Sequence, residues 1–407
     1  MDIGTVMNAM RDPAGIPSDP VIFQVLMVLT WIFHFAFVVM TLGTATLAIY
    51  SFYKRGTGPY WTSLSMAMTK ASKVGVSLLI VLGVAPLLFT QVIYDPQWYS
   101  ASVLSARWLI AFIFTLIIGY CSWFVFYYSN KEGAKNYLGI YALVGLSLFL
   151  LDGLIMHVLA YQSLLPDQWM RWYAPQGEVD TRGAALHAIQ WPRYIFLIGL
   201  SLPAAGIYLL AYSRYFRDRG DRSADYLAFA QSLGQRLLVA GSYLSTFLFL
   251  IWQADHPGEL GLIRHPLGWL IAASLVGLTV WSHRSRQRFS GYLPMLLGML
   301  LLGLIALWRE VIRISYLRPF GYDITTYTVH QDWPSMALFF LTLIGVGGLV
   351  GGFFLLTIFE AGRTSGQYVA SKSVARLGTA AVGILAIWIA VFFAYGIAIW
   401  MHNTFTL

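Results

Sequence analysis

The sequence predicts an all-α integral membrane protein, a bundle of about ten transmembrane helices with both termini on the non-cytoplasmic side. Three observations lead to this fold class. Only 11% of the 407 residues are charged and 58% are hydrophobic, whereas a water-soluble domain carries about a quarter charged residues. Apolar runs long enough to cross a bilayer recur along the chain. The connections between these runs alternate between basic and acidic composition.

The apolar runs define the predicted spans, since a run of about twenty apolar residues crosses the hydrocarbon core as a helix. The runs lie near 21–52, 72–94, 103–128, 137–164, 188–212, 226–252, 266–282, 291–317, 336–360 and 377–402. Residues 1–20 lack the basic start and apolar core of a signal peptide. We therefore expect a short N-terminal tail over 1–20 and a single polytopic membrane domain over 21–407.

The charged residues are divided unevenly between the two sets of connections. One set holds every lysine of the chain and many of its arginines, and the other holds mainly acids and tryptophans. Positively charged loops stay on the cytoplasmic side of a membrane, so both termini are predicted to lie on the opposite side. The net charge of +8 is therefore a topology signal and does not indicate binding to nucleic acid.

The chain has a single cysteine, Cys121, inside an apolar run. One thiol excludes a disulfide within the chain and an iron–sulfur cluster held by thiolates. There is also no C-x-x-C-H sequence for covalent heme attachment. Any redox cofactor that this chain holds alone must therefore be bound non-covalently through other residues.

Four of the eight histidines form two pairs of matched depth. His34 and His157 lie inside spans, each on the order of 12–15 Å below the outer surface at about 1.5 Å per residue. His187 and His265 stand at the outer threshold, just before the fifth and seventh spans. Two imidazoles can ligate one heme iron. A buried histidine can equally form a hydrogen bond to a neighbouring helix, and the residues alone leave both interpretations open.

A cluster of ionisable residues lies at the outer end of the eighth span, in WREVIRISYLRPFGYD. Arg309, Glu310 and Arg313 fall within about one helical turn, so the acid can pair with either arginine. Intramembrane charges indicate a functional site by default, and quinol oxidation needs a group that takes a proton beside one that polarises a carbonyl. An ion pair that anchors the helix is the alternative. Asp152 and Arg236 lie inside other spans, where we expect both to be buried.

Three segments carry a resemblance to a known family. LTWIFHFAFVVMTLG, from Leu29 to Gly43, resembles the first helix of subunit I of the cytochrome bd-type quinol oxidases, where the histidine is a heme ligand. GVAPLLFTQVIYDPQW is similar to the family's G-V-A…E…N-W stretch, and EVIR followed by RPF resembles its E-x-G-R-x-P-W. The resemblance implies that His34 binds heme and that Glu310 and Arg313 match the last motif. It suggests homology across nine spans, with a tenth added.

The sequence also departs from this family. Gln91 replaces the acid of the second stretch, the third span contains no glutamate, and LPMLLGMLLLGLIALW lacks the family's heme-ligating glutamate. The long quinol-binding loop is reduced to QADHPGELGLIR. These losses put oxygen reduction in doubt. The family's low-spin heme uses a helix-five histidine, which falls near Trp191 about one turn from His187, and a helix-seven methionine, which falls on His265. The resemblance thus implies a heme between His187 and His265.

Together these features predict a membrane subunit of a respiratory electron-transfer complex, a quinol:cytochrome c-type oxidoreductase. It would bind one or two b-type hemes and a membrane quinone, either menaquinone or ubiquinone. The predicted axial ligands of the heme iron are His34, His157, His187 and His265. The quinol chemistry is predicted for Glu310, Arg309 and Arg313.

The expected surroundings of this subunit follow from what the chain lacks. It has no covalent heme site and no large outer domain, so electrons must pass to or from a separate protein. We expect a periplasmic c-type cytochrome, multiheme in character, that docks on the acidic outer segments in a hetero-oligomer of the bacterial inner membrane. A divergent bd-type quinol oxidase and a heme-free membrane anchor or transporter are the alternatives.

Overall fold

The computed structural model describes residues 2–217, 219–284, 291–364 and 366–405. Within these ranges the secondary structure is helical, and ten helical segments are long and apolar enough to cross a membrane. The predicted fold class, an all-α bundle of about ten spans, is confirmed. The side of the membrane on which the termini lie stays a prediction.

The ten spans are built from twelve helices, because two spans each consist of two consecutive helices. The helices of the spans are α2 (Pro20–Tyr53), α3 (Trp61–Ile93), α5 (Ala106–Ser129), α6 (Gly139–Gln162), α8 (Trp191–Gly199) with α9 (Ser201–Arg217), α10 (Ala224–Ala254), α11 (Pro266–Arg284), α12 (Leu293–Leu317), α13 (Trp333–Phe340) with α14 (Gly351–Arg363), and α15 (Lys372–Phe405). A π-helix, Leu341–Val350, joins α13 to α14. The shorter helices are α1 (Ile3–Ala9), α4 (Asp95–Leu104) and α7 (Pro166–Tyr173).

Nine of the predicted spans agree with these helices to within about five residues at each end, and α3 is the exception. It begins at Trp61, well before the predicted start near residue 72. Its first turns contain Ser65 and Ser72, which interrupt the apolar run. Both hydroxyls are buried against α2, where Ser65 donates to the Ala48 carbonyl at 3.1 Å and Ser72 to the Thr44 hydroxyl at 3.0 Å. Hydrogen bonds between helices thus allow polar residues to continue a membrane helix.

The described chain divides into two compact units. The first unit contains the described residues of 1–13, 20–214 and 225–327, and the second contains the described residues of 14–19, 215–224 and 328–407. The single domain predicted for 21–407 stays a prediction. The second unit is built around α13, the π-helix, α14 and α15, and the Trp388 indole of α15 donates to the Thr342 hydroxyl at 2.7 Å.

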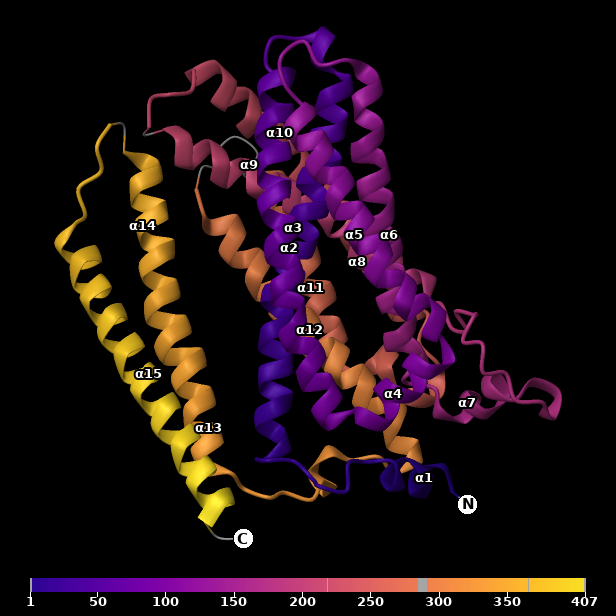
Figure 1. Cartoon of the computed structure of the whole chain (residues 1–407). Helices are drawn as coiled ribbons and strands as arrows, with labels where there is room; N and C mark the ends of the chain where they lie inside the picture. Colours follow the sequence, from indigo (N-terminus) through magenta and orange to yellow (C-terminus); the bar gives the residue numbers. More distant parts are fainter. Residues whose placement is uncertain (1, 218, 285–290, 365, 406–407) are drawn as a thin grey trace. The chain divides into compact units, whose positions relative to one another are not determined.

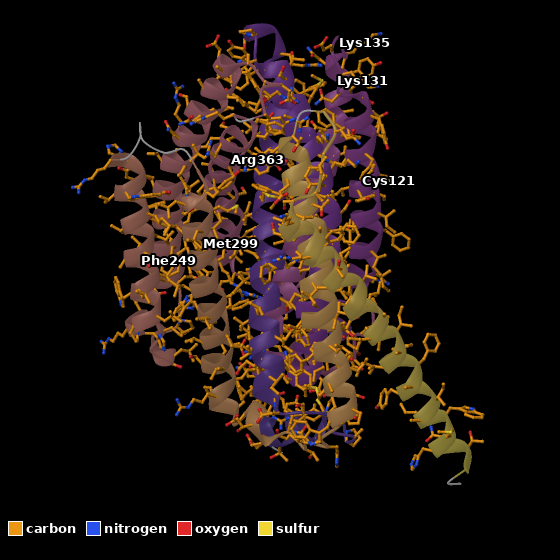
Figure 2. All side chains as sticks on the ribbon, turned by 90° about the vertical axis from the view of Figure 1, so that its left-hand side faces the viewer. Cys121, Lys131, Lys135, Phe249, Met299 and Arg363 are labelled. Atoms are coloured by element: carbon orange, nitrogen blue, oxygen red, sulfur yellow. The ribbon has the colours of Figure 1, made fainter. Side chains whose placement is uncertain are left out.

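In the first unit, α2 and α3 run side by side over most of their length (Figure 1). The core lies mainly among α2, α8, α10, α11 and α12. Phe196, Phe249, Trp252 and Trp308 are fully buried there, and Figure 2 labels Phe249 within the bundle. Lys131 and Lys135, in the basic connection between α5 and α6, lie at one end of this unit (Figure 2). Helix α1 lies at the opposite end (Figure 1), which we call the α1 end.

Glycines allow α9 and α10 to pack with their backbones in contact. A Cβ atom on Gly241 would lie 2.4 Å from the backbone nitrogen of Pro203, and one on Gly206 would lie 2.5 Å from that of Leu238. Such contacts stabilise membrane bundles because lipid supplies no hydrophobic force between helices, and close van der Waals packing takes its place.

We predict that Gly241→Ala destabilises the protein by about 1–3 kcal/mol, because the added methyl group must push two backbones apart. The measurement is the apparent unfolding temperature of the purified protein in detergent. Gly277→Ala on α11 is the matched control, since a Cβ atom there meets nothing within 4 Å. Equal unfolding temperatures for the two variants would contradict the close approach of α9 and α10.

Candidate functional site

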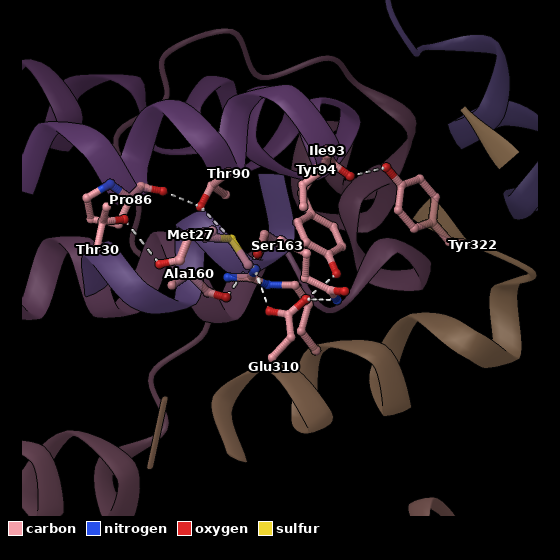
Figure 3. Close-up of polar contacts among 12 residues, drawn as sticks. Met27, Thr30, Pro86, Thr90, Ile93, Tyr94, Ala160, Ser163, Glu310 and Tyr322 are labelled. Atoms are coloured by element: carbon pink, nitrogen blue, oxygen red, sulfur yellow. Dashed lines mark hydrogen bonds and ion pairs between the residues drawn. The ribbon is translucent and has the colours of Figure 1, made fainter. Parts of the chain in front are cut away.

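Glu310 is the centre of a buried hydrogen-bond network near the C-terminal end of α12, with 7% of its surface exposed. Its Oε1 atom accepts from Gln24 of α2 at 2.8 Å and from the Tyr94 hydroxyl, just after α3, at 2.5 Å. Its Oε2 atom pairs with Arg313 at 2.9 Å. Figure 3 shows the Tyr94 hydroxyl directed at this carboxylate. Three donors therefore satisfy a charge that a single ion pair would leave under-coordinated in an apolar bundle.

Two of the three partners of Glu310, Arg313 and Tyr94, also contact each other. The Arg313 guanidinium lies over the Tyr94 ring, 4.5 Å from its centroid, and its Nη1 atom is 3.0 Å from the sulfur of Met27. Thr90 also donates to the Met27 sulfur, at 3.3 Å (Figure 3). Burial and the nearby Glu310 raise the pKa of Tyr94 well above its ordinary value, so its hydroxyl remains a donor. The network is thus fixed from several sides.

Glu310 and Arg313 line a cavity of about 180 Å³, which we call the carboxylate cavity. His34 and Arg309 also line it. Both of these residues line a second cavity of about 430 Å³ as well, together with His157. We call it the histidine cavity. The two cavities share this wall, so a ligand beside the histidines lies next to one beside Glu310.

His34 of α2 is oriented by the backbone of α3. Its Nδ1 atom lies 2.9 Å from the Leu79 carbonyl oxygen, which can only accept, so Nδ1 carries the hydrogen and Nε2 keeps its lone pair. The imidazole fits here because residue 83 is glycine: a Cβ atom on Gly83 would lie 2.8 Å from the ring. Metal-ligating histidines are commonly oriented in this way, through a backbone carbonyl on the second ring nitrogen.

His157 of α6 has the corresponding arrangement. Its Nε2 atom lies 3.0 Å from the Gln190 carbonyl oxygen, and its Nδ1 atom is buried without a partner in the described part of the chain. His34 and His157 thus each keep one free lone pair, and both line the histidine cavity. The free Nε2 atom of His34 fits an axial ligand of a heme iron, whereas His157 would have to turn its ring to offer Nε2. The described residues contain no group of three or more His, Cys, Asp or Glu side chains that could hold a metal ion, but an axially ligated heme needs only one or two.

The other two predicted ligands lie elsewhere. His187 stacks on Trp172 at a centroid distance of 5.1 Å. His265 accepts from the Leu267 amide through Nδ1 at 3.2 Å, which leaves the hydrogen on Nε2. Neither ring lines the carboxylate cavity or the histidine cavity. A heme held between them stays a prediction that these contacts do not favour.

The remaining ionisable side chains of the spans have separate surroundings. Arg309 forms no ion pair with Glu310; its guanidinium lies 4.1 Å from the centroid of the Trp31 ring. Asp152 is buried as expected and accepts from the Thr115 hydroxyl at 2.5 Å. The expectation that Arg236 is buried is wrong, because it is exposed on α10. An arginine can lie on the surface of a membrane helix when its long side chain reaches the interface.

Sequence reasoning missed two buried cationic or basic residues near this site. Arg193 at the start of α8 is 6% exposed and lines the histidine cavity; its charge inside an apolar span was the signal that could have found it. His256, just after α10, is buried between Trp252 and Trp308 with both ring nitrogens unpartnered among the described residues. No local pattern around it distinguishes it from an exposed loop residue.

The comparisons with known proteins concern the fold. No protein-family model and no curated protein sequence matches this chain. Its structure is similar to that of the bd oxidase from Geobacillus thermodenitrificans, with a TM-score of 0.54 and 12% sequence identity over 93% of this chain and 99% of that chain. At this identity the similarity shows the fold alone. The chain is thus a multi-pass membrane protein with a distant bd oxidase-like helical fold.

The surroundings of His256 generate a pH prediction. Burial, and to a lesser extent the charge of Arg193, lowers the pKa of His256 from 6.5 to about 4. A histidine that folds in its neutral form stabilises the folded state fully above its unfolded pKa. This stability is lost as the pH falls from about 6.5 towards about 4. We predict that lowering the pH from 7.5 to 5.5 reduces the free energy of unfolding of the wild type by on the order of 1 kcal/mol more than that of His256→Phe. The measurement is thermal unfolding at both pH values, and equal losses in the two proteins would contradict the prediction.

Proposed function

We propose that this protein is the membrane subunit of a respiratory complex that binds b-type heme and exchanges electrons with a membrane quinone. The observation that carries the proposal is the shared wall of the two cavities. His34 and Arg309 belong to this wall and line both cavities, His157 lines the histidine cavity alone, and Glu310 and Arg313 line the carboxylate cavity alone. The bd oxidase-like fold supports the proposal. A heme in the histidine cavity would supply one-electron transfer within reach of a quinol in the carboxylate cavity.

The residues of the carboxylate cavity fit the chemistry of quinol oxidation. A quinol gives up two electrons and two protons, so its site needs a group that accepts one proton from a hydroxyl, releases it to water, and then accepts the second. Glu310 takes this role, because its carboxylate accepts hydrogen bonds on both oxygens and can exchange one of these donors for a quinol hydroxyl. Arg313 holds the carboxylate in place. Tyr94 lines the same cavity and would contact the quinol ring, while Gln24 holds the carboxylate from α2.

Electrons must then pass between the heme and a separate protein. We infer that this partner is a periplasmic c-type cytochrome with several hemes, and that it docks on the segments at the α1 end. Asp167 at the start of α7 and the exposed Glu178 give this surface acidic groups, and Met170 is 68% exposed there. Complementary charges of this kind steer association between proteins.

A divergent bd-type quinol oxidase is the second candidate, favoured by the similarity in fold. The two are distinguished by the electron acceptor. Quinol-dependent oxygen consumption by the purified chain would favour the oxidase, and transfer to a c-type cytochrome without oxygen consumption would favour the proposed complex.

We predict that His34→Ala lowers the heme content by one heme per chain, because the variant loses an axial ligand. In the wild type the Leu79 carbonyl orients this ligand. The measurement is the pyridine hemochrome assay on the purified protein. His283→Ala is the control, since His283 is exposed at the end of α11. A wild-type heme content in His34→Ala would place the iron elsewhere.

A further prediction concerns Glu310→Gln, which keeps the shape of the side chain but removes its ability to accept a proton. We expect quinol-dependent heme reduction to slow by about 10²-fold or more, while the absorption spectrum of the heme stays unchanged. Stopped-flow spectroscopy measures this rate. Glu259→Gln, at an exposed position, is the control; if both variants turn over normally, Glu310 serves only to anchor α12.

A further inference from the structure

The histidine cavity contains more positive charge than its described surroundings neutralise. Arg193 from α8 and Arg309 from α12 both line it. Neither guanidinium forms an ion pair in the described part of the chain, and the Nε atom of each is buried without a hydrogen-bond partner. The third arginine nearby, Arg313, is already paired with Glu310. An arginine cannot lose its proton to relieve such a charge.

Asp152 is the acid that lines the same cavity. One of its oxygens accepts from Thr115, and the other, Oδ2, is buried without a partner among the described residues. It forms no ion pair with Arg193 or Arg309 there. Even if it remains ionised, two guanidinium groups face a single carboxylate. Buried charges without partners are strongly unfavourable, so an occupant that carries acidic groups best explains this wall.

We propose that Arg193 and Arg309 form an anion site in the histidine cavity and bind the paired acidic groups of its occupant. For a b-type heme these groups are its two propionate carboxylates. The planar guanidinium fork matches a carboxylate through two parallel hydrogen bonds. This assignment rests on the proposed function for the identity of the occupant. It gives Arg309 a role other than polarising a quinone carbonyl, in agreement with its lack of an ion pair with Glu310.

The test compares Arg193→Gln and Arg309→Gln with Arg236→Gln, the exposed control on α10. Removing a cation beside the propionates favours ferric heme. We expect each of the first two variants to shift the ratio of reduced to oxidised heme at fixed potential by about tenfold, which is 59 mV for a one-electron couple. Arg309→Lys keeps the charge and should restore the ratio, while losing heme to apomyoglobin faster than the wild type because a single ammonium lacks the fork. Redox titration monitored by absorption gives the ratio.

A second arm separates direct contact from a charge that acts at a distance. Protein loaded with heme b is compared with protein loaded with the iron porphyrin whose two carboxylates are methyl esters. The faster loss of heme to apomyoglobin that Arg193→Gln and Arg309→Gln cause with heme b should disappear with the ester, because no carboxylate remains to be bound. An equal effect with both porphyrins, or no effect with either, would overturn the proposal. The proposed function would still stand in that case if the purified protein contains heme.

The remaining source of acidic groups is the phosphate of an anionic lipid. Mass spectrometry of the purified protein counts the phospholipid that stays bound. One anionic phospholipid per chain in a heme-free wild type, lost in both glutamine variants and kept in Arg236→Gln, would support the anion site with a lipid occupant and reject the proposed function. If neither heme nor lipid depends on Arg193 and Arg309, there is no anion site.

Discussion

The structure depends on how a few ionisable side chains are satisfied inside an apolar bundle. Glu310 is the best example, because Gln24 of α2, Tyr94 just after α3 and Arg313 of α12 itself all donate to it. Each of these hydrogen bonds to a charged group contributes about 1.5–3 kcal/mol, and those from Gln24 and Tyr94 also tie α12 to α2 and to the end of α3. The network therefore positions the helices as well as the carboxylate. The same contacts define the wall of the carboxylate cavity.

A second set of contacts prepares the histidine cavity. The carbonyls of Leu79 and Gln190 accept hydrogen bonds from His34 and His157, and one ring nitrogen of each histidine keeps its lone pair. Gly83 gives the first ring its space. These groups belong to α2, α3, α6 and the segment before α8, so a ligand between the imidazoles would link helices far apart in the sequence. Arrangement on rigid helices holds the groups of a binding site more precisely than loops would.

The spans could be predicted from the sequence because each depends on a local property, a run of apolar residues that matches the bilayer thickness. Depth along a helix is also local, and it suggested pairing His34 with His157, which line one cavity. The direction in which a helix face points depends on how the helices pack, which the local sequence does not determine. Gln24 and Tyr94 could therefore not be predicted as partners of Glu310. His187 lies in a connection whose conformation depends on tertiary contacts such as the Trp172 ring. Arg193 could have been predicted, because a charged residue inside a membrane span usually indicates a functional site.

The most direct test of the central claim is an experimental density map of the purified protein at a resolution that separates side chains. The account predicts a planar density between the imidazoles of His34 and His157, with a metal peak on the free nitrogen of His34. Acyl-chain density in that cavity, or side chains that close it, would contradict the account.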